Sequence, residues 1–327
     1  MNRRDFLKAS AAGAVAFSAI RPETLSSQGV PQTAKVALIK TTDRARGVVD
    51  VIELLGAPSP KGKKVFIKPN FNTADPAPGS THNDTLGRLV LEMKARGAAQ
   101  VTVGDRSGPP KTRQVLADKG IPALAQELGF DVVNFEDMPT DGWVHFNPAG
   151  NHWANGFDVA KPVVEAEYLL STCCLKTHGY GGVFTLSLKL AVGMTPKSLM
   201  RELHAARETH MRRMIAEINQ GYKPQLIVVD GVEAFVDEGP STGKKVEAGV
   251  FLAGTDRIAV DAVGVAILKE LGSNEAIMSK KVFEQEQIQR AVELGLGVNG
   301  PDKIEIVTAD AAGKAYADKI KAILAQG

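Results

Sequence analysis

Short apolar runs alternate with amphipathic stretches along the chain from residue 35 onward. The apolar runs predict strands at residues 35–40, 65–67, 101–103, 132–133, 168–175, 226–229, 250–253 and 304–307. Apolar side chains spaced by three and four predict helices at residues 46–55, 82–96, 112–129 (broken near 120–122), 197–220, 257–271, 282–294 and 314–325. Strands that alternate with helices predict an α/β fold with a mostly parallel sheet and helices on both faces.

Five of the predicted strands end in polar loops marked by glycine or proline. These ends carry Lys68 and Asn70, Asp105 and Ser107, Lys176 and His178, Asp230, and Thr255 with Asp256. The carboxyl ends of parallel strands share one edge of a sheet, where ligands bind. We therefore expect the strand-end loops to converge on a single site.

The stretch 168–193 is the strongest candidate for chemistry. An apolar strand ends in Lys176, Thr177 and His178, and a glycine-rich turn leads to Lys189. Side chains alternate along a strand, so Lys176 and His178 share a side if the strand continues. A nearby lysine disfavours protonation of an imidazole, which would make His178 a base near neutral pH or a metal ligand. The alternative is a histidine on a surface loop beside a solvated lysine.

Other candidates have an equally ordinary alternative. His82 lies at a predicted helix start, where anions bind, or it is a capping residue that faces water. Asp105 is a ligand for a metal or hydroxyl group, or part of an Asx turn. Asp256 caps the following helix or joins the site, and Asp261 is expected to pair with a buried lysine. His204 and Glu208 share a predicted helix face, which we expect to be solvated.

Two segments are predicted to be irregular. Residues 138–162 are rich in proline, glycine and asparagine, and their tryptophans predict a lid over the site. Residues 235–245 predict a polar loop. The GPSTGK sequence at 239–244 does not have the spacing of a phosphate-binding P-loop. No G-x-G-x-x-G follows the first strand either, so neither nucleotide-binding motif is present.

Charge and hydropathy exclude two classes of partner. The net charge is +2, and without residues 1–16 the chain has 36 basic and 36 acidic side chains. A nucleic-acid-binding protein would need a basic face, so no nucleic-acid partner is expected. Beyond residue 20 no apolar run approaches the roughly 20 residues that span a membrane.

The N-terminus resembles a twin-arginine export signal. Residues 3–8 read RRDFLK, residues 9–20 are small and apolar, and residues 21–34 have the composition of a linker. We therefore divide the chain into a signal and linker (1–34) and an α/β domain (35–327). The expected location is the periplasm, the expected partner is the twin-arginine export machinery, and no stable membrane span is expected after signal removal. A chance basic start, or a signal kept as an anchor, is the alternative.

The two cysteines, Cys173 and Cys174, are adjacent in a predicted strand. Neighbouring cysteines rarely satisfy disulfide geometry, and two are too few for a four-cysteine cluster. We expect no iron–sulfur cluster, and we interpret both as buried strand residues rather than as soft-metal ligands with His178.

Nine short motifs occur in an order that resembles the "domain of unknown function 362" family. They are KPN (68–70), TH (81–82), GDRSG (104–108), LKTHG (175–179), SLKLAVG (187–193), VVDGV (228–232), EGPSTG (238–243), GTDRIAVDAVG (254–264) and ELGLG (293–297). The family is mostly uncharacterised. The resemblance implies an iron–sulfur protein only for members with a ferredoxin-like cysteine cluster, which this chain lacks, and Leu190 stands where the commoner motif has Asn.

A second resemblance is to the nickel-dependent lactate racemase family, which also places histidines and lysines at loop ends of an α/β scaffold. No motif of that family matches residue by residue, so the resemblance bears only on the type of chemistry.

These observations predict an exported enzyme that performs acid/base or metal-assisted chemistry on a carboxylated or phosphorylated small molecule. The candidate catalytic residues are His178, His82 and Lys189, and the candidate binding residues are Lys68, Asn70, Ser107, Lys176 and Thr177. Asp105 and Asp230 are candidate ligands for a divalent metal, which is the candidate cofactor. The alternative is a non-catalytic periplasmic protein that binds a ligand or carries a cofactor through the same residues.

Overall fold

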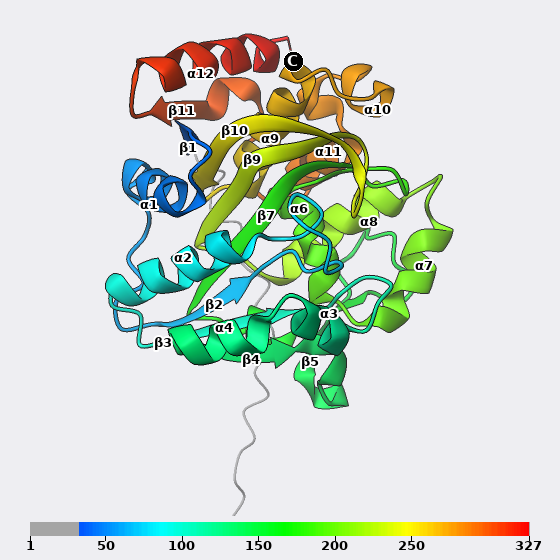
Figure 1. The fold of residues 1–327 in the computed structure, drawn as a ribbon. Helices are drawn as coiled ribbons and strands as arrows, with labels where there is room; N and C mark the ends of the chain where they lie inside the picture. The colour runs from blue at the N-terminus through cyan, green and yellow to red at the C-terminus, as the bar shows by residue number, and fades with distance from the viewer. Residues whose placement is uncertain (1–32, 327) are drawn as a thin grey trace, which may run out of the picture.

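A computed structural model describes residues 33–326, so the predicted export signal lies outside the described residues. Its main sheet has the strand order β11-β1-β10-β9-β7-β2-β3-β4, with β8 paired to β7 (Figure 1). The strands are β1 (Ala34–Lys40), β2 (Lys64–Lys68), β3 (Gln100–Asp105), β4 (Asp131–Asn134), β7 (Tyr168–His178), β8 (Val183–Thr185), β9 (Leu226–Glu238), β10 (Gly243–Gly254) and β11 (Ile304–Thr308). In this sheet β10 and β8 pair antiparallel and the other pairings are parallel, which confirms the predicted class.

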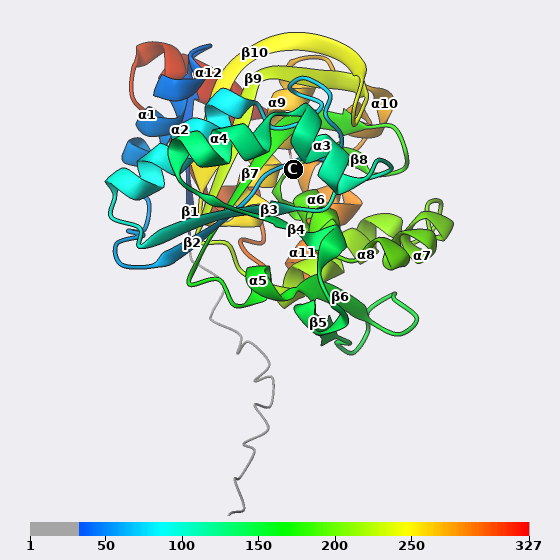
Figure 2. The ribbon, with the colours of Figure 1, turned by 60° about the horizontal axis from the view of Figure 1, so that its bottom comes forward.

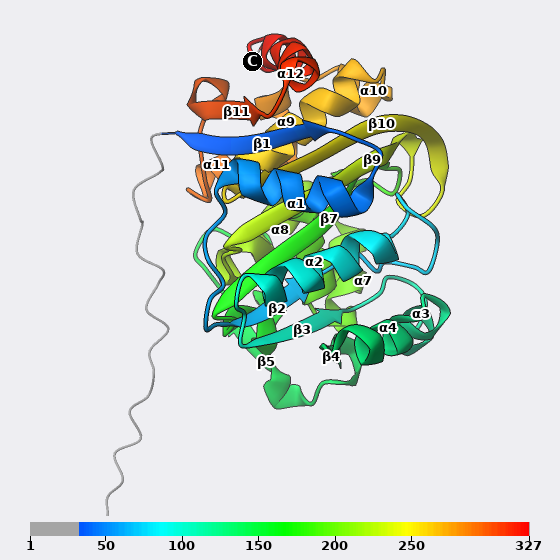
Figure 3. The same cartoon turned by 60° about the vertical axis from the view of Figure 1, so that its left-hand side comes forward.

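Helices cover both faces of the sheet because each strand alternates its apolar side chains between two cores. In β1, Val36 and Leu38 pack into one core while Ala37 and Ile39 pack into the other. One face carries α1 (Arg44–Leu55), α2 (Asn83–Ala95), α3 (Thr112–Asp118) and α4 (Ile121–Leu128), as Figure 3 shows for α1, α2 and α4. The other face carries α6 (Ser187–Leu190), α8 (Met211–Ile218), α9 (Arg257–Glu270), α11 (Glu286–Glu293) and α12 (Ala311–Leu324). Three short helices complete the set: α5 (Lys161–Val164), α7 (Met200–Ala205) and α10 (Glu275–Met278).

Three strands are longer than predicted. Lys176 to His178 belong to β7, where they pair with β8. The polar loop predicted at 235–245 is instead mostly a β-hairpin, in which β9 and β10 continue beyond the sheet to a tip at residues 239–242. The exposed charged residues Asp237, Glu238, Lys244 and Lys245 lie where the two strands leave the sheet, and they concealed the hairpin in the sequence.

The direction of β10 overturns one part of the predicted convergence. Because β10 is antiparallel to its neighbours, Asp256 follows it at the opposite edge of the sheet. Its carboxylate accepts hydrogen bonds from Ala259 N at 2.9 Å and Val298 N at 2.8 Å. Asp256 therefore caps α9, which is the simpler of the two predicted roles.

The helix predicted at 197–220 is interrupted. It divides into α7 and α8 around a turn at residues 206–210, so His204 and Glu208 do not share a helix face. Residues 138–162 contain a second, small sheet of β5 (Trp143–Phe146) and β6 (Phe157–Ala160), which lies beside α8 (Figure 2). Within residues 33–326, no helix combines the length and apolar character needed to cross a membrane.

Candidate functional site

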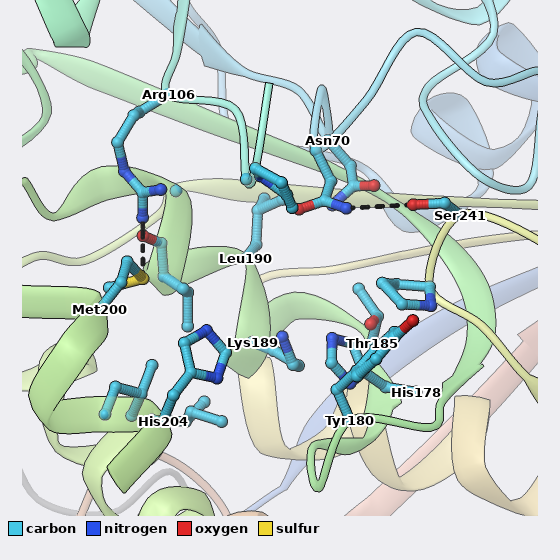
Figure 4. Close-up of a pocket in the computed structure, with 18 of the residues that line it drawn as sticks. Asn70, Arg106, His178, Tyr180, Thr185, Lys189, Leu190, Met200, His204 and Ser241 are labelled. Atoms are coloured by element: carbon cyan, nitrogen blue, oxygen red, sulfur yellow. Dashed lines mark hydrogen bonds between the residues drawn. The ribbon is translucent and has the colours of Figure 1, made fainter. Parts of the chain in front are cut away.

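A pocket of about 620 Å³ lies at the carboxyl ends of β2, β3 and β7 (Figure 4). Its polar lining includes Lys68, Asn70, Asp105, Arg106, His178 and Lys189. Residues of α7 and α8 and the β9–β10 tip complete its wall. Segments that are far apart in the chain thus meet in one pocket, as the strand-end pattern predicts. No residue of 138–162 lines it, so the predicted lid is wrong: Trp153 is buried and donates to Met214 O.

Lys68 and Asp105 form a buried ion pair. Lys68 Nζ lies 2.6 Å from Asp105 Oδ1, and both side chains are almost fully buried. The Asp105 carboxylate also accepts hydrogen bonds from Phe71 N and Arg106 N, each at 2.6 Å. Burial raises the pKa of Asp105 and lowers that of Lys68, while each charge opposes the shift of the other. These three donors oppose the effect of burial on Asp105 and occupy both of its oxygens.

Gly193 is required beside this ion pair. A Cβ at Gly193 would lie 2.6 Å from Asp105 Oδ1 and 2.9 Å from Lys68 Nζ, so a larger residue would push the pair apart. The glycine of the SLKLAVG motif therefore allows the turn after α6 to pack on the ends of β2 and β3.

Asp230 does not join Asp105. It lies within β9, where its carboxylate accepts from Arg44 Nε at 3.0 Å, Thr85 Oγ1 at 2.6 Å and Val232 N at 3.1 Å. It does not line the pocket. In residues 33–326 no group of three or more histidine, cysteine or acidic side chains is arranged to hold a metal ion. With their oxygens taken up by other donors, Asp105 and Asp230 do not fit the predicted pair of metal ligands.

Lys176 holds loops together rather than lining the pocket. Its Nζ donates to Asn70 Oδ1 at 3.0 Å, Gly79 O at 2.5 Å and Pro240 O at 2.8 Å. Burial lowers its pKa to about 8. Its neighbour Thr177 is also buried and donates to Phe235 O at 3.3 Å. Neither residue has the predicted substrate-binding position, because β7 continues past them and buries both.

His82 and Ser107 also lie outside the pocket lining. His82 is the N-cap of α2, and its Nδ1 accepts from Asp84 N at 3.1 Å. This is the capping role named as the alternative. Ser107 is buried, and its backbone N–H donates to Thr112 Oγ1 at 2.9 Å.

Lys189 is the exceptional side chain of the pocket. It lies on the one-turn helix α6, and no hydrogen bond or ion pair joins its amine to any side chain or carbonyl within the described part of the chain. Burial, and to a smaller extent the charges of Lys176 and Arg106, lower the pKa of Lys189 to about 7. A lysine in this environment is a neutral amine for much of the time at pH 7.

The position of Lys189 is fixed by its helix. The Asp261 carboxylate of α9 accepts from Ser187 N at 2.8 Å and Leu188 N at 2.9 Å, and Asn219 Nδ2 donates to Leu188 O at 2.9 Å. Burial raises the pKa of Asp261 to about 7. The prediction that Asp261 pairs with a buried lysine is therefore wrong, since it caps the turn that carries Lys189.

His178 lies against the same glycine as Lys189. A Cβ at Gly182 would be 2.5 Å from Lys189 Cε and 2.9 Å from His178 Nδ1, so these side chains are neighbours (Figure 4). Burial, Lys189 and Lys176 hold the pKa of His178 well below its usual value, as the sequence predicts for an imidazole beside lysine. Its buried Nδ1 has no hydrogen-bond partner in residues 33–326, and neither has Thr185 Oγ1, which also lines the pocket.

Arg106 was not predicted as a site residue. Its buried guanidinium donates to Thr195 O at 2.7 Å, to Ser107 O at 2.9 Å and to Val192 O, but no carboxylate of the described chain pairs with it. It fixes the segment after α6 to the end of β3 and leaves a positive charge beside the pocket. Its place in the GDRSG motif, directly after a strand, was the available signal.

His204 was missed as well. It lines the pocket from α7, and burial followed by the charges of Lys189 and Arg106 lowers its pKa. Figure 4 shows the Lys189 side chain between His204 and His178. The expected continuous helix had placed His204 on a solvated face, so the break after α7 is what brings it to the pocket.

Part of the pocket lining is apolar. It is formed by Leu190, Val192, Met200, Leu203, Met211 and Ile215. Arg106 Nη2 lies 3.3 Å from Met200 Sδ, so the pocket combines a positive charge with an adjacent surface that would accept a hydrocarbon or aromatic group.

Comparison with known proteins identifies the family. The sequence profile of the family described as "Domain of unknown function (DUF362)" matches residues 65–266. The chain belongs to this family. A thylakoid-associated protein of Synechocystis sp. is 24% identical over 214 residues, which span 64% of this chain and 64% of that protein. Among solved structures, the lactate racemase apoprotein from Thermoanaerobacterium thermosaccharolyticum matches 87% of this chain and 85% of its own, with 13% identity and a TM-score of 0.44. Nothing about the chemistry of the pocket follows from that likeness.

Proposed function

We propose that this protein is an enzyme that moves protons to or from a small molecule carrying a carboxylate or a phosphate. One observation carries the proposal. The Lys189 amine and His178 Nδ1, which have no hydrogen-bond partner in residues 33–326, lie together in a pocket whose unpaired charges are positive. Both side chains are shifted toward their neutral forms, in which each has a nitrogen lone pair that can accept a proton from a bound substrate. Lys189 and His178 are thus the proposed acid/base pair.

The charge balance supports an anionic ligand. Among residues 33–326, Asp105 is the only acidic residue that lines the pocket, and Lys68 neutralises it. At the rim, Lys197 pairs with Glu136 at 3.0 Å and Arg207 pairs with Glu208 at 3.3 Å. The charges of Arg106, and of Lys176 behind the pocket, remain without a carboxylate in residues 33–326. An anionic group on the ligand would balance them.

The wider setting of the enzyme is also a proposal. The sequence of residues 3–8 supports export through the twin-arginine route, and hence action in the periplasm. No step is assigned to a metal, because other donors occupy the oxygens of Asp105 and Asp230.

Deuterium exchange tests the proposal. The purified protein is incubated in D2O with 2-oxo acids, 2-hydroxy acids and phosphate monoesters, and NMR follows deuterium incorporation while native mass spectrometry follows binding. For a compound that exchanges, Lys189→Met and His178→Asn should each lower the rate by about 100-fold or more. Lys314→Met, which changes an exposed lysine of α12, is the control and should leave the rate unchanged.

Two outcomes contradict the proposal in different ways. Binding that depends on both residues, with no exchange for any compound, would favour the non-catalytic carrier over the enzyme. Exchange at wild-type rates in both variants would show that the chemistry lies elsewhere.

A further inference from the structure

Resting on the proposed function, we propose that Lys189 is a nucleophile that forms an iminium with the aldehyde or ketone carbonyl of an acidic substrate with an apolar tail. The inference starts from the geometry of its amine, which faces the pocket without a partner in the described chain, beside His178 and in a pocket with an apolar surface.

Unlike the other lysines near the pocket, Lys189 forms no hydrogen bond or ion pair through its amine in residues 33–326. Lys68 is paired with Asp105, Lys176 donates to three oxygens, and Lys197 donates to Pro110 O and pairs with Glu136. Their amines are therefore committed to the structure. Only the amine of Lys189 is free to reach the carbon atom of a ligand.

The surroundings of Lys189 also favour the nucleophilic form of the amine. Burial and the positive charges of Lys176 and Arg106 bring its pKa to about 7, and no carboxylate faces it to stabilise the ammonium. The two histidines beside it, His178 and His204, are themselves shifted toward the neutral form. Desolvation and neighbouring cations are established means of activating a lysine for attack on carbonyl groups.

A nucleophile must also be held in place, and α6 provides this. Asp261 binds the two N–H groups at its start, and Asn219 binds the carbonyl of Leu188. Leu188 and Leu190, on either side of Lys189, are buried. Lys189 is the residue of this turn that brings a charged group into the pocket. Preorganisation of this kind reduces the entropy that bond formation costs.

The proposed step balances without a cofactor. The lone pair of neutral Lys189 Nζ adds to the carbonyl carbon, the C=O electron pair moves to oxygen, and a proton passes from nitrogen to that oxygen. A second proton on the oxygen allows the C–O bond to break, so that water leaves and a cationic iminium remains. One amine, one carbonyl compound and one proton thus give one iminium and one water. His178, whose Nδ1 is unoccupied, is placed to carry these protons.

The iminium explains the pairing of the two residues. Its positive charge draws electrons from the adjacent carbon, so that a C–H proton there becomes acidic and can pass to His178. Addition of water reverses the sequence and frees Lys189. The substrate class is a carbonyl acid with a hydrocarbon or aromatic group, because Met200, Leu203 and Ile215 give the pocket an apolar surface and the Arg106 guanidinium, 3.3 Å from Met200 Sδ, places a positive charge beside it.

Reductive trapping tests this inference. The full-length protein is treated with phenylpyruvate and sodium cyanoborohydride at pH 7, and intact-mass analysis and peptide mapping locate the secondary amine. We expect a single adduct on Lys189, formed at least about 100-fold faster than at exposed lysines, because a lysine of ordinary pKa is less than about 0.1% neutral at this pH. Lys314→Met should label as wild type does, and Lys189→Met should not label.

Lys189→Arg separates the nucleophile from a simple anion-binding role. Arginine keeps the positive charge but forms no iminium with the probe, so this variant should bind phenylpyruvate and give no adduct. If the wild type binds phenylpyruvate through Lys189 but gives no adduct, the iminium is wrong and the proposed function stands. If adducts form on exposed lysines as fast as on Lys189, the inference is also wrong. If no compound binds in a Lys189-dependent way, both proposals fail.

Discussion

Lys176, which is buried, and Lys189, which is half-buried at the pocket, lie near the same edge of the sheet and have opposite surroundings. The Lys176 ammonium has three oxygen acceptors at 2.5 to 3.0 Å, two in the loop between β2 and α2 and one in the β9–β10 tip. The Lys189 amine, which lies in the pocket, has no oxygen acceptor in residues 33–326. The first arrangement binds a proton and joins loops, and the second disfavours the proton and leaves the amine available.

The contrast shows that burial of a lysine does not by itself indicate function. Burial lowers the pKa of both residues, to about 8 for Lys176 and about 7 for Lys189. What separates them is the satisfaction of their hydrogen bonds. A buried polar group with all its partners stabilises a fold, whereas one without partners needs another explanation, such as a ligand.

The largest expected effect is on stability at Lys176. Lys176→Met would leave Gly79 O, Pro240 O and the Asn70 amide oxygen without their donor, so we expect a loss of about 3 kcal/mol in the free energy of unfolding. Urea denaturation measures it. A variant as stable as wild type would mean that Lys176 does not stabilise the loops. The structural role assigned to Lys176, in contrast to Lys189, would then be wrong.

A smaller effect is expected at Asp261, which positions Lys189. Asp261→Asn keeps the shape but replaces one of the two oxygens that accept from Ser187 N and Leu188 N with an NH2 donor, so we expect about 1.5 kcal/mol less stability. Labelling of Lys189 by phenylpyruvate should slow, because the α6 turn is held less firmly. Rapid labelling in this variant would show that the turn positions itself.

The smallest effect is on stability at Lys189, and its sign depends on pH. The folded-state pKa of about 7 lies below the ordinary 10.5, so between these values the unfolded chain binds the proton more readily than the folded chain. Wild-type stability should therefore rise with pH across this window, whereas Lys189→Met lacks this contribution.

We expect Lys189→Met to be more stable than wild type at pH 7 by on the order of 1 kcal/mol, since water in the pocket screens the charge, and the advantage to disappear near pH 10. Denaturation of both proteins from pH 7 to 10 measures the difference, in which the contribution of Lys176 cancels. A Lys189→Met variant that is less stable than wild type at pH 7 would show that the ammonium has a partner after all.

Much of the fold is predictable from local patterns. The apolar runs locate the central strands, and the spacing of apolar residues in 82–96 and 257–271 locates α2 and α9 to within a few residues. The direction of β10 is not encoded in such patterns, because it depends on which strands pair. That single direction moves Asp256 from the expected site to the opposite edge.

The site itself is predictable in part for the same reason. The pocket lining includes Lys68, Asn70, Asp105 and His178, which strand ends indicated, and Lys189, which the segment after the glycine-rich turn indicated. The chemical roles of these residues stay predictions. Local patterns do not show how far a strand continues, so Lys176 and Thr177 were expected in a loop and are buried in β7. Nor do they show a helix break, which is why the expected continuous helix concealed His204.

The reversed direction of β10 has a consequence for how this pocket can change. Because β10 runs back along β9, the two are joined by a short tip rather than by a crossover helix. Pro240 and Ser241 of this tip line the pocket, and Gly239 O accepts from Gly179 N at 3.2 Å. Insertions or deletions there would reshape this part of the pocket wall without changing the order of the strands. Such a change must keep the hydrogen bond from Lys176 Nζ to Pro240 O, which ties the tip to the sheet.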